Sequence, residues 1–531
     1  MPPARIAVLG GGLTGLSSAF HLSRKFPETN IVLLERQRRL GGWVRSERVD
    51  LPQVGASVLL EAGPRTLRPN SKAVLELIHL LRLEDEVITV PKTAPPAKAR
   101  FIYVPESETT PKRASGLQRL PSSIPSLISS PFLPMLLAAV APEPFKKANR
   151  PQGATDESVD SLFSRRFGET FARTFGSALV HGIYATDSRK LSVRAAFPSI
   201  WEAEGHGRGS IVRGFLMPNK RKTLDSGYAL GRTTELMRNA SVYSFRNGME
   251  SLTKALEESL MSSDNVTIMK DTRLSGLKQL EDHSMEIYPA EGKTLQASHV
   301  VSALPLPTLH NLISAHKSVP PIPHLTKNPA STVRVVNLVF SCPPKDIHPE
   351  GFGYLIPRPA EGYPESYEPT SPGILGTVFD SCSLHEQDLP HIKDYYNHSG
   401  HTKLTMMTGG PYPQAPLPPT LSSTESPMIP PFIRSLLDEL KVQLRRDIPD
   451  PIYWRTWNNE GCIPTLLPGH LERMEELKAH LGLPSSASAS QRAGTAERGW
   501  NNRLVVVGAG VGGVSVGDCV EAGRHVGKNW T

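Results

Sequence analysis

The stretch "IAVLGGGLTGLSSAFHLS", residues 6 to 23, joins a short β-branched run, three consecutive glycines and an amphipathic segment. Residues 6–9 predict a buried strand, and the apolar spacing over 16–26 predicts a helix. The glycines of a G-x-G-x-x-G pattern between them are Gly10, Gly12 and Gly15. In this pattern one glycine makes a tight turn, one lets a pyrophosphate approach the backbone, and one allows close helix–strand packing. The N–H groups at the helix start would then face the phosphates.

An acidic residue follows this unit at the spacing that a dinucleotide site requires. The segment "NIVLLERQ" (30–37) predicts a second strand that ends at Glu35. This carboxylate comes about twenty residues after Gly15, where it can hold the hydroxyls of a ribose. A glycine turn in a nucleotide-free α/β sheet is the alternative, but the two features together favour a dinucleotide site.

The carboxy-terminal stretch "NRLVVVGAGVGGVSVGDCVEAGRHVG" (502–527) contains a second G-x-G-x-x-G at Gly508, Gly510 and Gly513. Only 18 residues follow Gly513, which is too few for a second βαβ unit of about 30 residues. We therefore expect a strand over 503–507, a glycine loop, and a helix from about Val514. Segments from both ends of the chain predict a discontinuous nucleotide-binding domain, with 247–260, 266–277 and 299–306 as its middle section.

The composition limits the remaining possibilities. A chain of 531 residues can form two or more cores. Its 49 prolines and four cysteines without paired spacing predict long irregular connections and argue against a disulfide framework or a zinc site. A net charge of +8 permits an anionic partner. We expect no secretory signal and no transmembrane helix, because a strand begins near Arg5 and no apolar run reaches 18 residues.

A second glycine cluster indicates which cofactor is bound. "ERQRRLGGWVRS" (35–46) places Arg39 and the pair Gly41–Gly42 directly after the acidic strand, and "EAGPRTLRP" (61–69) follows. Taken alone, the pair could be a β-hairpin turn. Beside the fingerprint, this arrangement resembles the flavoprotein superfamily of amine oxidases, phytoene desaturases and protoporphyrinogen oxidases, in which it closes over FAD.

Within that superfamily the chain is most similar to the oxygen-dependent, eukaryotic protoporphyrinogen oxidase family, in a fungal form. The further segments that carry this resemblance are "RFIYVP" (100–105), "VHGIYATDSRKLSVRAAFPS" (180–199), "SFRNGMESL" (244–252), "GFGYLIP" (351–357), "NEGCIPTLLPGH" (459–470) and "GVSVGDCVEAG" (513–523). The resemblance implies a six-electron oxidation of protoporphyrinogen IX to protoporphyrin IX in haem biosynthesis. Hydride transfer to FAD would be followed by reduction of O2 to hydrogen peroxide.

The resemblance also implies an architecture and a location. We expect an α/β fold with a Rossmann-like FAD-binding domain (1–92, 240–305 and 460–531), an α+β substrate-binding domain (93–105 and 306–459) and a mainly helical membrane-associating domain (106–239). The family lies peripherally on the mitochondrial inner membrane and faces the intermembrane space. An anionic lipid surface, ferrochelatase and a second copy of the chain are the partners that the resemblance suggests, and we expect no nucleic-acid partner.

The residues that match the family's FAD contacts come from both ends of the chain and from its middle section. They are Gly10, Gly11, Gly12, Leu13, Thr14, Gly15, Glu35, Arg39, Gly42, Trp43, Gly63, Pro64, Arg65, Thr66, Leu274, Ala509, Val514, Ser515 and Val516. Leu274 is expected near the adenine.

The tetrapyrrole substrate is an apolar disc with two propionates, so its pocket should combine apolar side chains with a cation. Arg100 matches the family arginine that pairs with a propionate, and its planar fork suits a carboxylate. Gly182, Phe352 and Leu355 match residues that line the cavity, and Met407 is a similar case. The alternatives are an exposed arginine at a strand start and ordinary core positions. His181 stands where family members often carry arginine.

No catalytic side-chain base and no metal ligand set is predicted. A hydride transfer to the N5 atom of a flavin depends on alignment more than on a base, and the 17 histidines are scattered. The protein is expected to bind, orient and exclude water, while the flavin carries the chemistry. A flavin amine or polyamine oxidase and a non-enzymatic protein similar to GDP-dissociation inhibitors are the alternative functions.

The segment 120–150 alternates short apolar stretches with prolines and ends in Lys146, Lys147 and Arg150. Apolar segments flanked by basic residues are typical of an interfacial membrane site. The alternative is a helical cap over the substrate cavity that has no lipid contact.

Overall fold

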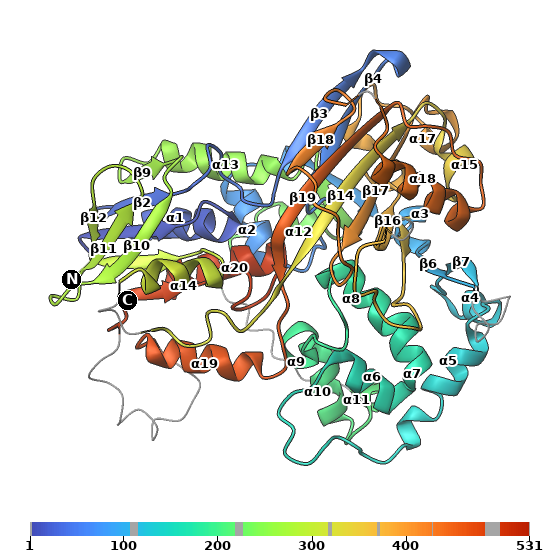
Figure 1. The fold of residues 1–531 in the computed structure, drawn as a ribbon, viewed down its shortest axis with the longest axis horizontal. Coiled ribbons are helices and arrows are strands. Elements are labelled where there is room, and N and C mark those ends of the chain that lie inside the picture. Colours follow the sequence, from blue (N-terminus) through green and yellow to red (C-terminus); the bar gives the residue numbers. More distant parts are fainter. Residues whose placement is uncertain are drawn as a thin grey trace.

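A five-stranded parallel sheet organises the part of the fold that contains the amino terminus of the chain (Figure 1). The computed structural model describes residues 3–106, 115–217, 227–316, 321–368, 372–426, 428–483 and 500–529. The order of the strands in the sheet is β20 (Leu504–Val506), β13 (His299–Ser302), β1 (Arg5–Leu9), β2 (Asn30–Leu34) and β9 (Val266–Met269). Every neighbouring pair is parallel. The sheet is thus assembled from segments that lie far apart in the sequence, and the predicted α/β class is confirmed.

Both faces of this sheet are buried, which is why its strands are continuous apolar runs rather than alternating ones. Ile6 and Val8 face a core formed with the helices α1, α2, α13 and α20. Ala7 and Leu9 face a second core formed with α14, α19 and a three-stranded sheet. The bounds of these elements are α1 (Leu13–Lys25), α2 (Lys72–Leu80), α13 (Glu250–Met261), α20 (Val516–Asn529), α14 (Leu306–Ser314), α19 (His470–His480), β10 (Leu274–Gln279), β11 (Met285–Pro289) and β12 (Leu295–Ala297).

The two ends of the chain meet where α20 packs against α1. A Cβ atom at Gly523 would lie 2.6 Å from the Cβ of Ser17, and one at Gly527 would lie 2.2 Å from the Cβ of His21. Neither position can therefore carry a side chain at this helix spacing. The Ser17 hydroxyl also donates to the carbonyl of Val520 at 2.9 Å.

An eight-stranded, mostly antiparallel sheet forms the second large unit. Its order is β18 (Thr420–Ser422), β19 (Tyr453–Pro464), β14 (Ala330–Phe340), β17 (Thr402–Gly409), β16 (Ile374–Val378), β15 (Gly353–Leu355), β6 (Phe101–Val104) and β7 (Gly116–Arg119). Helix α18 (Pro431–Leu444) contributes to the core on one face. The opposite face meets the segment that follows Glu61, because Ala62 shares an apolar cluster with Val335 and Trp457.

Two antiparallel strand pairs and several short helices complete these units. The pairs are β3 (Ser46–Leu51) with β4 (Ala56–Glu61), and β5 (Val87–Pro91) with β8 (Ala240–Phe245). The short helices are α3 (Pro95–Lys98), α12 (Thr233–Leu236), α15 (Pro344–Ile347), α16 (Asp380–Ser383) and α17 (Tyr395–His398).

A helical lobe lies below the eight-stranded sheet in Figure 1. Its elements are α4 (Ile124–Ile128), α5 (Leu133–Val140), η4 (Glu143–Phe145), α6 (Val159–Phe167), α7 (Glu169–Phe171), η5 (Ala172–Gly176), α8 (Ser177–Tyr184), α9 (Val193–Ala196), α10 (Pro198–His206) and α11 (Ile211–Leu216). The domain boundaries stay a prediction. Two elements inside the predicted helical segment belong elsewhere: β7 pairs with β6, and α12 packs against α2.

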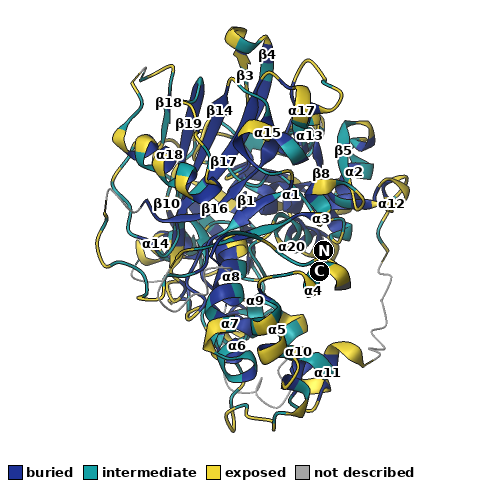
Figure 2. Cartoon of the chain, turned by 90° about the vertical axis from the view of Figure 1, so that its right-hand side faces the viewer, coloured by how far each residue is buried: buried dark blue, intermediate teal, exposed yellow. Residues whose placement is uncertain are grey.

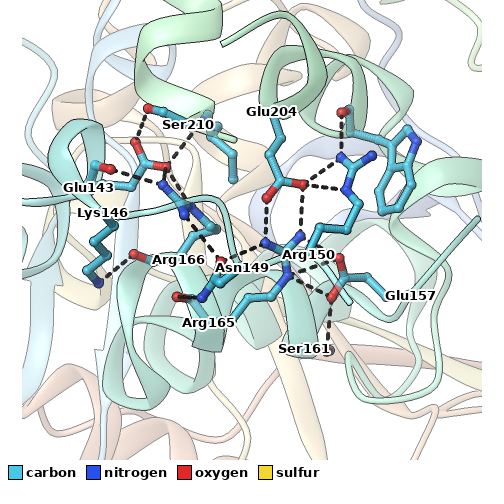
Figure 3. Close-up of polar contacts among 12 residues, drawn as sticks. Glu143, Lys146, Asn149, Arg150, Glu157, Ser161, Arg165, Arg166, Glu204 and Ser210 are labelled. Carbon is cyan, nitrogen blue, oxygen red and sulfur yellow. Dashed lines mark hydrogen bonds and ion pairs between the residues drawn. The ribbon is translucent and has the colours of Figure 1, made fainter. Parts of the chain in front are cut away.

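Buried ion pairs fasten the segment around η4 to the rest of this lobe (Figure 3). Glu143 and Arg166 are fully buried and form an ion pair at 2.7 Å. Burial alone would raise the pKa of Glu143, but hydrogen bonds from Ser210 and Arg166 outweigh it and hold that pKa below its usual range. A second cluster joins the carboxylate of Glu204 to the guanidinium groups of Arg150 and Arg165. Such charges are tolerated inside a protein only when they are paired and hydrogen-bonded.

Candidate functional site

The glycine loop after β1 is shaped by contacts that only glycine permits. A Cβ atom at Gly15 would lie 1.8 Å from the carbonyl oxygen of Gly10, so α1 could not approach the strand with any side chain there. A Cβ at Gly11 would lie 2.5 Å from Leu40. At Gly12, by contrast, a Cβ would meet no atom within 4 Å. The packing of the described residues therefore does not require glycine at position 12, and the space beside it can accept a ligand.

The amino terminus of α1 opens toward the same space. Gly12 is the N-cap residue, no side chain caps the helix, and its first turn holds no acidic residue. The first intrahelical bond runs from the N–H of Leu16 to the carbonyl of Gly12 at 2.9 Å. The N–H groups of the preceding turn are therefore available to an anion, and the helix dipole favours negative charge there.

Glu35 lies directly after β2, with its carboxylate against the glycine loop. It accepts hydrogen bonds from the N–H of Gly11 at 2.7 Å and of Gln37 at 2.9 Å. The link from β9 to β10 runs alongside, since the N–H of Thr272 donates to the carbonyl of Glu35 at 2.8 Å. Leu274, two residues further on, begins β10 and is partly buried. Its predicted contact with the adenine stays a prediction.

The second glycine cluster is not a hairpin turn. Gly41 forms a parallel bridge with Gly12, and its N–H donates to the carbonyl of Gly11 at 2.8 Å. Both Gly41 and Gly42 have positive φ values, +102° and +59°, which favour glycine. The Arg39 guanidinium donates to the carbonyls of Leu40, Gly42 and Val44. Arg39 thus stabilises the conformation of the 40–44 loop through hydrogen bonds to its carbonyl groups.

The third predicted cofactor loop, 63–66, packs against the second. A Cβ at Gly63 would lie 2.5 Å from the carbonyl oxygen of Trp43, whose own side chain is 42% exposed. The Arg65 side chain is buried and pairs with both carboxylate oxygens of Asp380 at 3.2 Å. Its guanidinium therefore faces α16, the short helix that follows β16 of the eight-stranded sheet. Pro64 and Thr66 flank it in the same loop.

The carboxy-terminal loop completes this group. β20 is the edge strand of the parallel sheet, and α20 ends the described chain, so the second glycine pattern does not build a separate βαβ unit. A Cβ at Gly508 would lie 3.4 Å from the hydroxyl oxygen of Thr14, which places this loop beside the start of α1. Ala509 bridges to Gly513. The Ser515 hydroxyl and N–H donate to Asp518 at 2.7 and 3.0 Å in the first turn of α20, which begins at Val516.

The predicted substrate residues come together on neighbouring elements. The methyl carbons of Leu355 in β15 lie 2.8 Å from the position of a Cβ on Gly182 in α8. Leu355 is opposite Gly376 in the sheet, and Gly376 is opposite Met407. Met407 also packs with Ala62 and Trp457, so this face of the sheet adjoins the cofactor loops.

Arg100 is a partly buried cation beside Phe352, another of the predicted substrate residues. Its guanidinium carbon is 5.5 Å from the centre of the Phe352 ring, and the N–H of Phe352 donates to the carbonyl of Ala99 at 2.9 Å. The Nε of Arg100 is buried without a hydrogen-bond partner, and no ion pair involves this residue in the described part of the chain. Burial and the neighbouring charge of Arg68 lower the pKa of Arg100. A partly buried charge without a counter-ion favours binding of an anion.

His181 cannot supply the positive charge that an arginine supplies at this position in many family members. Its Nδ1 lies 2.7 Å from the carbonyl oxygen of Ile356 and its Nε2 lies 2.8 Å from the Tyr363 hydroxyl. A carbonyl can only accept, so Nδ1 carries the proton and Nε2 accepts from Tyr363. Burial lowers the pKa of His181 to about 4. The ring is therefore neutral and fastens the 356–363 loop to α8.

Several residues that complete the site were not among the predicted site residues, although Asn459 begins the segment 459–470 that carries the family resemblance. Asp380 pairs with Arg65, and the Asn459 amide donates to the carbonyl of Ala62 at 2.8 Å. Asn337 and Trp457 hydrogen-bond to each other at 3.0 Å beneath the same loops. Polar residues inside otherwise apolar strands are the signal that could have drawn attention to them. No three His, Cys, Asp or Glu side chains gather to hold a metal ion among the residues that the structure describes.

Comparison with known proteins agrees with this arrangement. Residues 13–420 match the family described as flavin containing amine oxidoreductase. Protoporphyrinogen oxidase of Schizosaccharomyces pombe is 31% identical over 98% of both chains. Protoporphyrinogen oxidase of Homo sapiens is also 31% identical, over 98% of this chain and 97% of its own. A solved structure from Exiguobacterium sp. 255-15 has the same fold, with a TM-score of 0.70 at 20% identity, and covers 99% of this chain and 98% of its own.

Replacing Gly12 with valine tests whether the open space beside it holds the flavin's pyrophosphate. The backbone at Gly12 (φ −74°, ψ 179°) suits valine, so Gly12→Val should fold normally. We expect the purified variant to be colourless, as measured by absorbance near ~450 nm. Gly400→Val is the matched control, because a Cβ there also meets nothing within 4 Å. Full flavin occupancy in Gly12→Val would show that the loop serves only the fold.

The neutral, buried state of His181 predicts a loss of stability in acid. Between pH 6.5 and pH 4 the unfolded chain binds a proton at this residue and the folded chain does not, so stability falls as the pH drops through this range. The contribution is about 3 kcal/mol at most. Denaturant unfolding at pH 7 and pH 4 should therefore show a smaller acid loss for His181→Asn than for the unsubstituted protein. Equal losses would mean that His181 is not neutral in the folded state.

Proposed function

The chain belongs to the flavin containing amine oxidoreductase family, and we propose that it oxidises protoporphyrinogen IX to protoporphyrin IX with FAD as its cofactor. Removing six hydrogens from the substrate reduces three O2 molecules to three hydrogen peroxide molecules, which balances the reaction. The observation that carries the proposal is Arg100, a partly buried cation without a carboxylate partner among the described residues, which lies beside Phe352 and near the charge of Arg68 in the segment 61–69.

The cofactor loops fit FAD in their chemistry as well as in their sequence. The uncapped start of α1 and the open space at Gly12 suit a pyrophosphate. Glu35 lies where a carboxylate can accept from ribose hydroxyls, in place of its present backbone donors. FAD, when bound, supplies the two-electron acceptor for each oxidation step.

The substrate residues would orient the macrocycle and keep water out. Arg100 would pair with a propionate through its planar fork. Phe352 and Leu355 would contact the apolar ring, and Gly182, which has no side chain, leaves room for the Leu355 side chain to lie against α8. Since alignment to about 3–3.5 Å is the main requirement of a hydride transfer, no base is assigned.

The two alternative functions fit these features less well. An amine or polyamine oxidase binds a cationic substrate, which a partly buried and unpaired Arg100 would repel. A protein similar to GDP-dissociation inhibitors would need neither the open space at Gly12 nor a flavin. The close curated relatives named above are oxidases of protoporphyrinogen.

The same proposal includes a peripheral position on the mitochondrial inner membrane, facing the intermembrane space. Exposed residues lie on α5 and α11 at the outer end of the helical lobe (Figure 2), and η4 contacts both of these helices. The exposed fractions are 88% for Phe145, 60% for Phe215 and 79% for Leu216. Apolar side chains of this kind can insert into the headgroup region. No helix in the described part of the chain is long and apolar enough to span a bilayer.

The basic residues of this surface have unequal roles, which corrects the grouping expected from the sequence. The Lys146 ammonium donates to the carbonyl of Arg166 at 2.7 Å, and Arg150 pairs with Glu204 and lies 3.7 Å from the ring centre of Trp201. Lys147 is exposed and forms no ion pair with the described residues. Lys147 is thus the residue of the three that is available to anionic lipid. Ferrochelatase as a partner and association of two copies are further parts of this proposal.

Arg100→Ala should raise the KM for protoporphyrinogen IX and lower kcat/KM about ten- to a hundredfold, because a charge-assisted hydrogen bond contributes roughly 1.5–3 kcal/mol. Arg100→Lys should recover only part of the loss, since it lacks the fork. The assay follows porphyrin fluorescence under air. Arg119→Ala, on the paired strand β7 and exposed, is the control. Turnover of Arg100→Ala at the rate of the control would place the propionate anchor elsewhere.

Replacing Phe145 and Phe215 together with serine should weaken sedimentation with cardiolipin-containing vesicles and leave the flavin bound. Lys147→Glu should weaken binding further at low salt but not at high salt, because charge attraction is screened beyond ~8–10 Å. Met261 and Val442 are similarly exposed but lie on α13 and α18, and their double serine variant is the control. If the Phe145/Phe215 variant sediments as fully as this control, the lobe is a cap rather than a membrane site.

A further inference from the structure

One face of the eight-stranded sheet holds the backbone that leads to the 63–66 loop. Three consecutive strands of this sheet, β17, β14 and β19, each contribute one donor side chain. The Lys403 ammonium donates to the carbonyl of Leu59 at 2.8 Å. The Asn337 amide donates to the carbonyl of Glu61 at 3.4 Å, and the Asn459 amide donates to the carbonyl of Ala62 at 2.8 Å. The path of the chain into this cofactor loop is therefore set by side chains of the sheet.

A chain of buried hydrogen bonds continues from these contacts; we call it the sheet chain, and its members are Trp457, Asn337, Thr405 and Asp380. The indole N–H of Trp457 donates to the Asn337 amide oxygen at 3.0 Å, and the Asn337 amide nitrogen donates to the Thr405 hydroxyl at 2.8 Å. The Thr405 hydroxyl donates to Asp380. Since an indole can only donate and a carboxylate can only accept, every bond in the chain has one possible direction.

Both ends of the sheet chain contact the cofactor loops. At one end Asp380 pairs with Arg65 of the 63–66 loop. At the other end the Arg45 guanidinium carbon lies 4.5 Å from the ring centre of Trp457, and the carbonyl of Arg45 accepts from the N–H of Ala62 at 2.9 Å. Thr405 is also two residues before Met407 in β17, so both side chains lie on the same face of the sheet.

We propose that Thr405 and Asn337 are positioning residues of the flavin reaction, acting through Asp380 and Arg65 to fix the 63–66 loop against the flavin. This inference rests on the proposed flavin-dependent function. Neither residue is placed against the substrate or the cofactor. Each is completely or almost completely buried and connects strands to loops that are far away in the sequence. A shift of about 1 Å in such a support can cost about a hundredfold in rate.

The hydrogen bonds that Asp380 accepts give the proposal a second consequence. Asp380 accepts from Arg65 and Thr405. Removing the Thr405 hydroxyl leaves the carboxylate with one donor fewer, and a buried polar group is costly when its hydrogen bonds are missing. The position of the 63–66 loop and the electrostatic field at the flavin should both change. The reduction potential of the flavin should therefore change together with its visible circular dichroism.

Thr405→Val is the decisive variant, and Thr377→Val is its matched control. Thr377 lies on the neighbouring strand β16, where it is opposite Met406, and both threonines are buried. The Thr377 hydroxyl takes no part in the sheet chain. The substitution is identical at the two sites, so a general packing effect should appear in both variants.

The measurements are made on purified, flavin-loaded protein. We expect Thr405→Val to keep its flavin and to show an altered reduction potential in dye equilibration and an altered visible circular dichroism of the flavin. Rapid mixing with protoporphyrinogen should show flavin reduction slowed about ten- to a hundredfold, with KM changed little. Thr377→Val should match the unsubstituted protein, and Thr405→Ser, which keeps the hydroxyl, should restore all three values.

Equal potentials and equal dichroism in Thr405→Val and Thr377→Val would overturn the proposal. A Thr405→Ser variant that behaves like Thr405→Val would also overturn it, because the hydroxyl would then not be the active group. Equal flavin loss from both valine variants would do the same, since it would assign the effect to packing. The potential and the dichroism need no porphyrinogen, so failure of the proposed substrate would be seen separately, as unreduced flavin in the unsubstituted protein.

Discussion

The close approach of α1 to the strand before it is the constraint on which the rest of the structure depends. It exists because Gly15 lies so near the carbonyl of Gly10 that no side chain fits between them. The helix start, uncapped and without an acid, is thereby held at the carboxyl ends of the parallel strands. Each other loop of the site is then placed from this point: Gly41 bonds to the carbonyl of Gly11, and Gly63 packs on the carbonyl of Trp43.

Buried charge is used in two different ways in this molecule. Arg166 with Glu143 and Arg65 with Asp380 are paired, so their desolvation is offset by the partner and by further hydrogen bonds. Arg100 is only partly buried and has no such partner in the described residues. Pairs of the first kind fix segments that are distant in sequence, whereas a charge of the second kind suits a ligand that brings its own anion. By this difference Arg65, which is paired and supports the site, is distinguished from Arg100, the proposed substrate contact.

The helical lobe is stiffened from inside and apolar at its outer end. The ion-pair clusters of Figure 3 hold the segment around η4 against α6, α10 and α11. That support keeps Phe145 outside the lobe although it is a large apolar side chain. Lys146 and Arg150 are part of the same support: the Lys146 ammonium donates to the carbonyl of Arg166, and Arg150 pairs with Glu204.

The sequence by itself determined the fold class, the glycine loops and the position of Glu35. These features are visible there because they depend on local periodicity or on motifs whose spacing follows directly from backbone geometry. The group that contains Arg100, Phe352 and Leu355 was expected only from the resemblance to a known family, because no local pattern marks it. Only the tertiary structure decided what individual polar side chains do. It turned Arg65 toward Asp380, made His181 a neutral support, and joined Asn337 to Thr405 across 68 residues of sequence. Such pairings leave no periodic pattern, because a buried polar group needs only one partner and folding can bring that partner from anywhere in the chain.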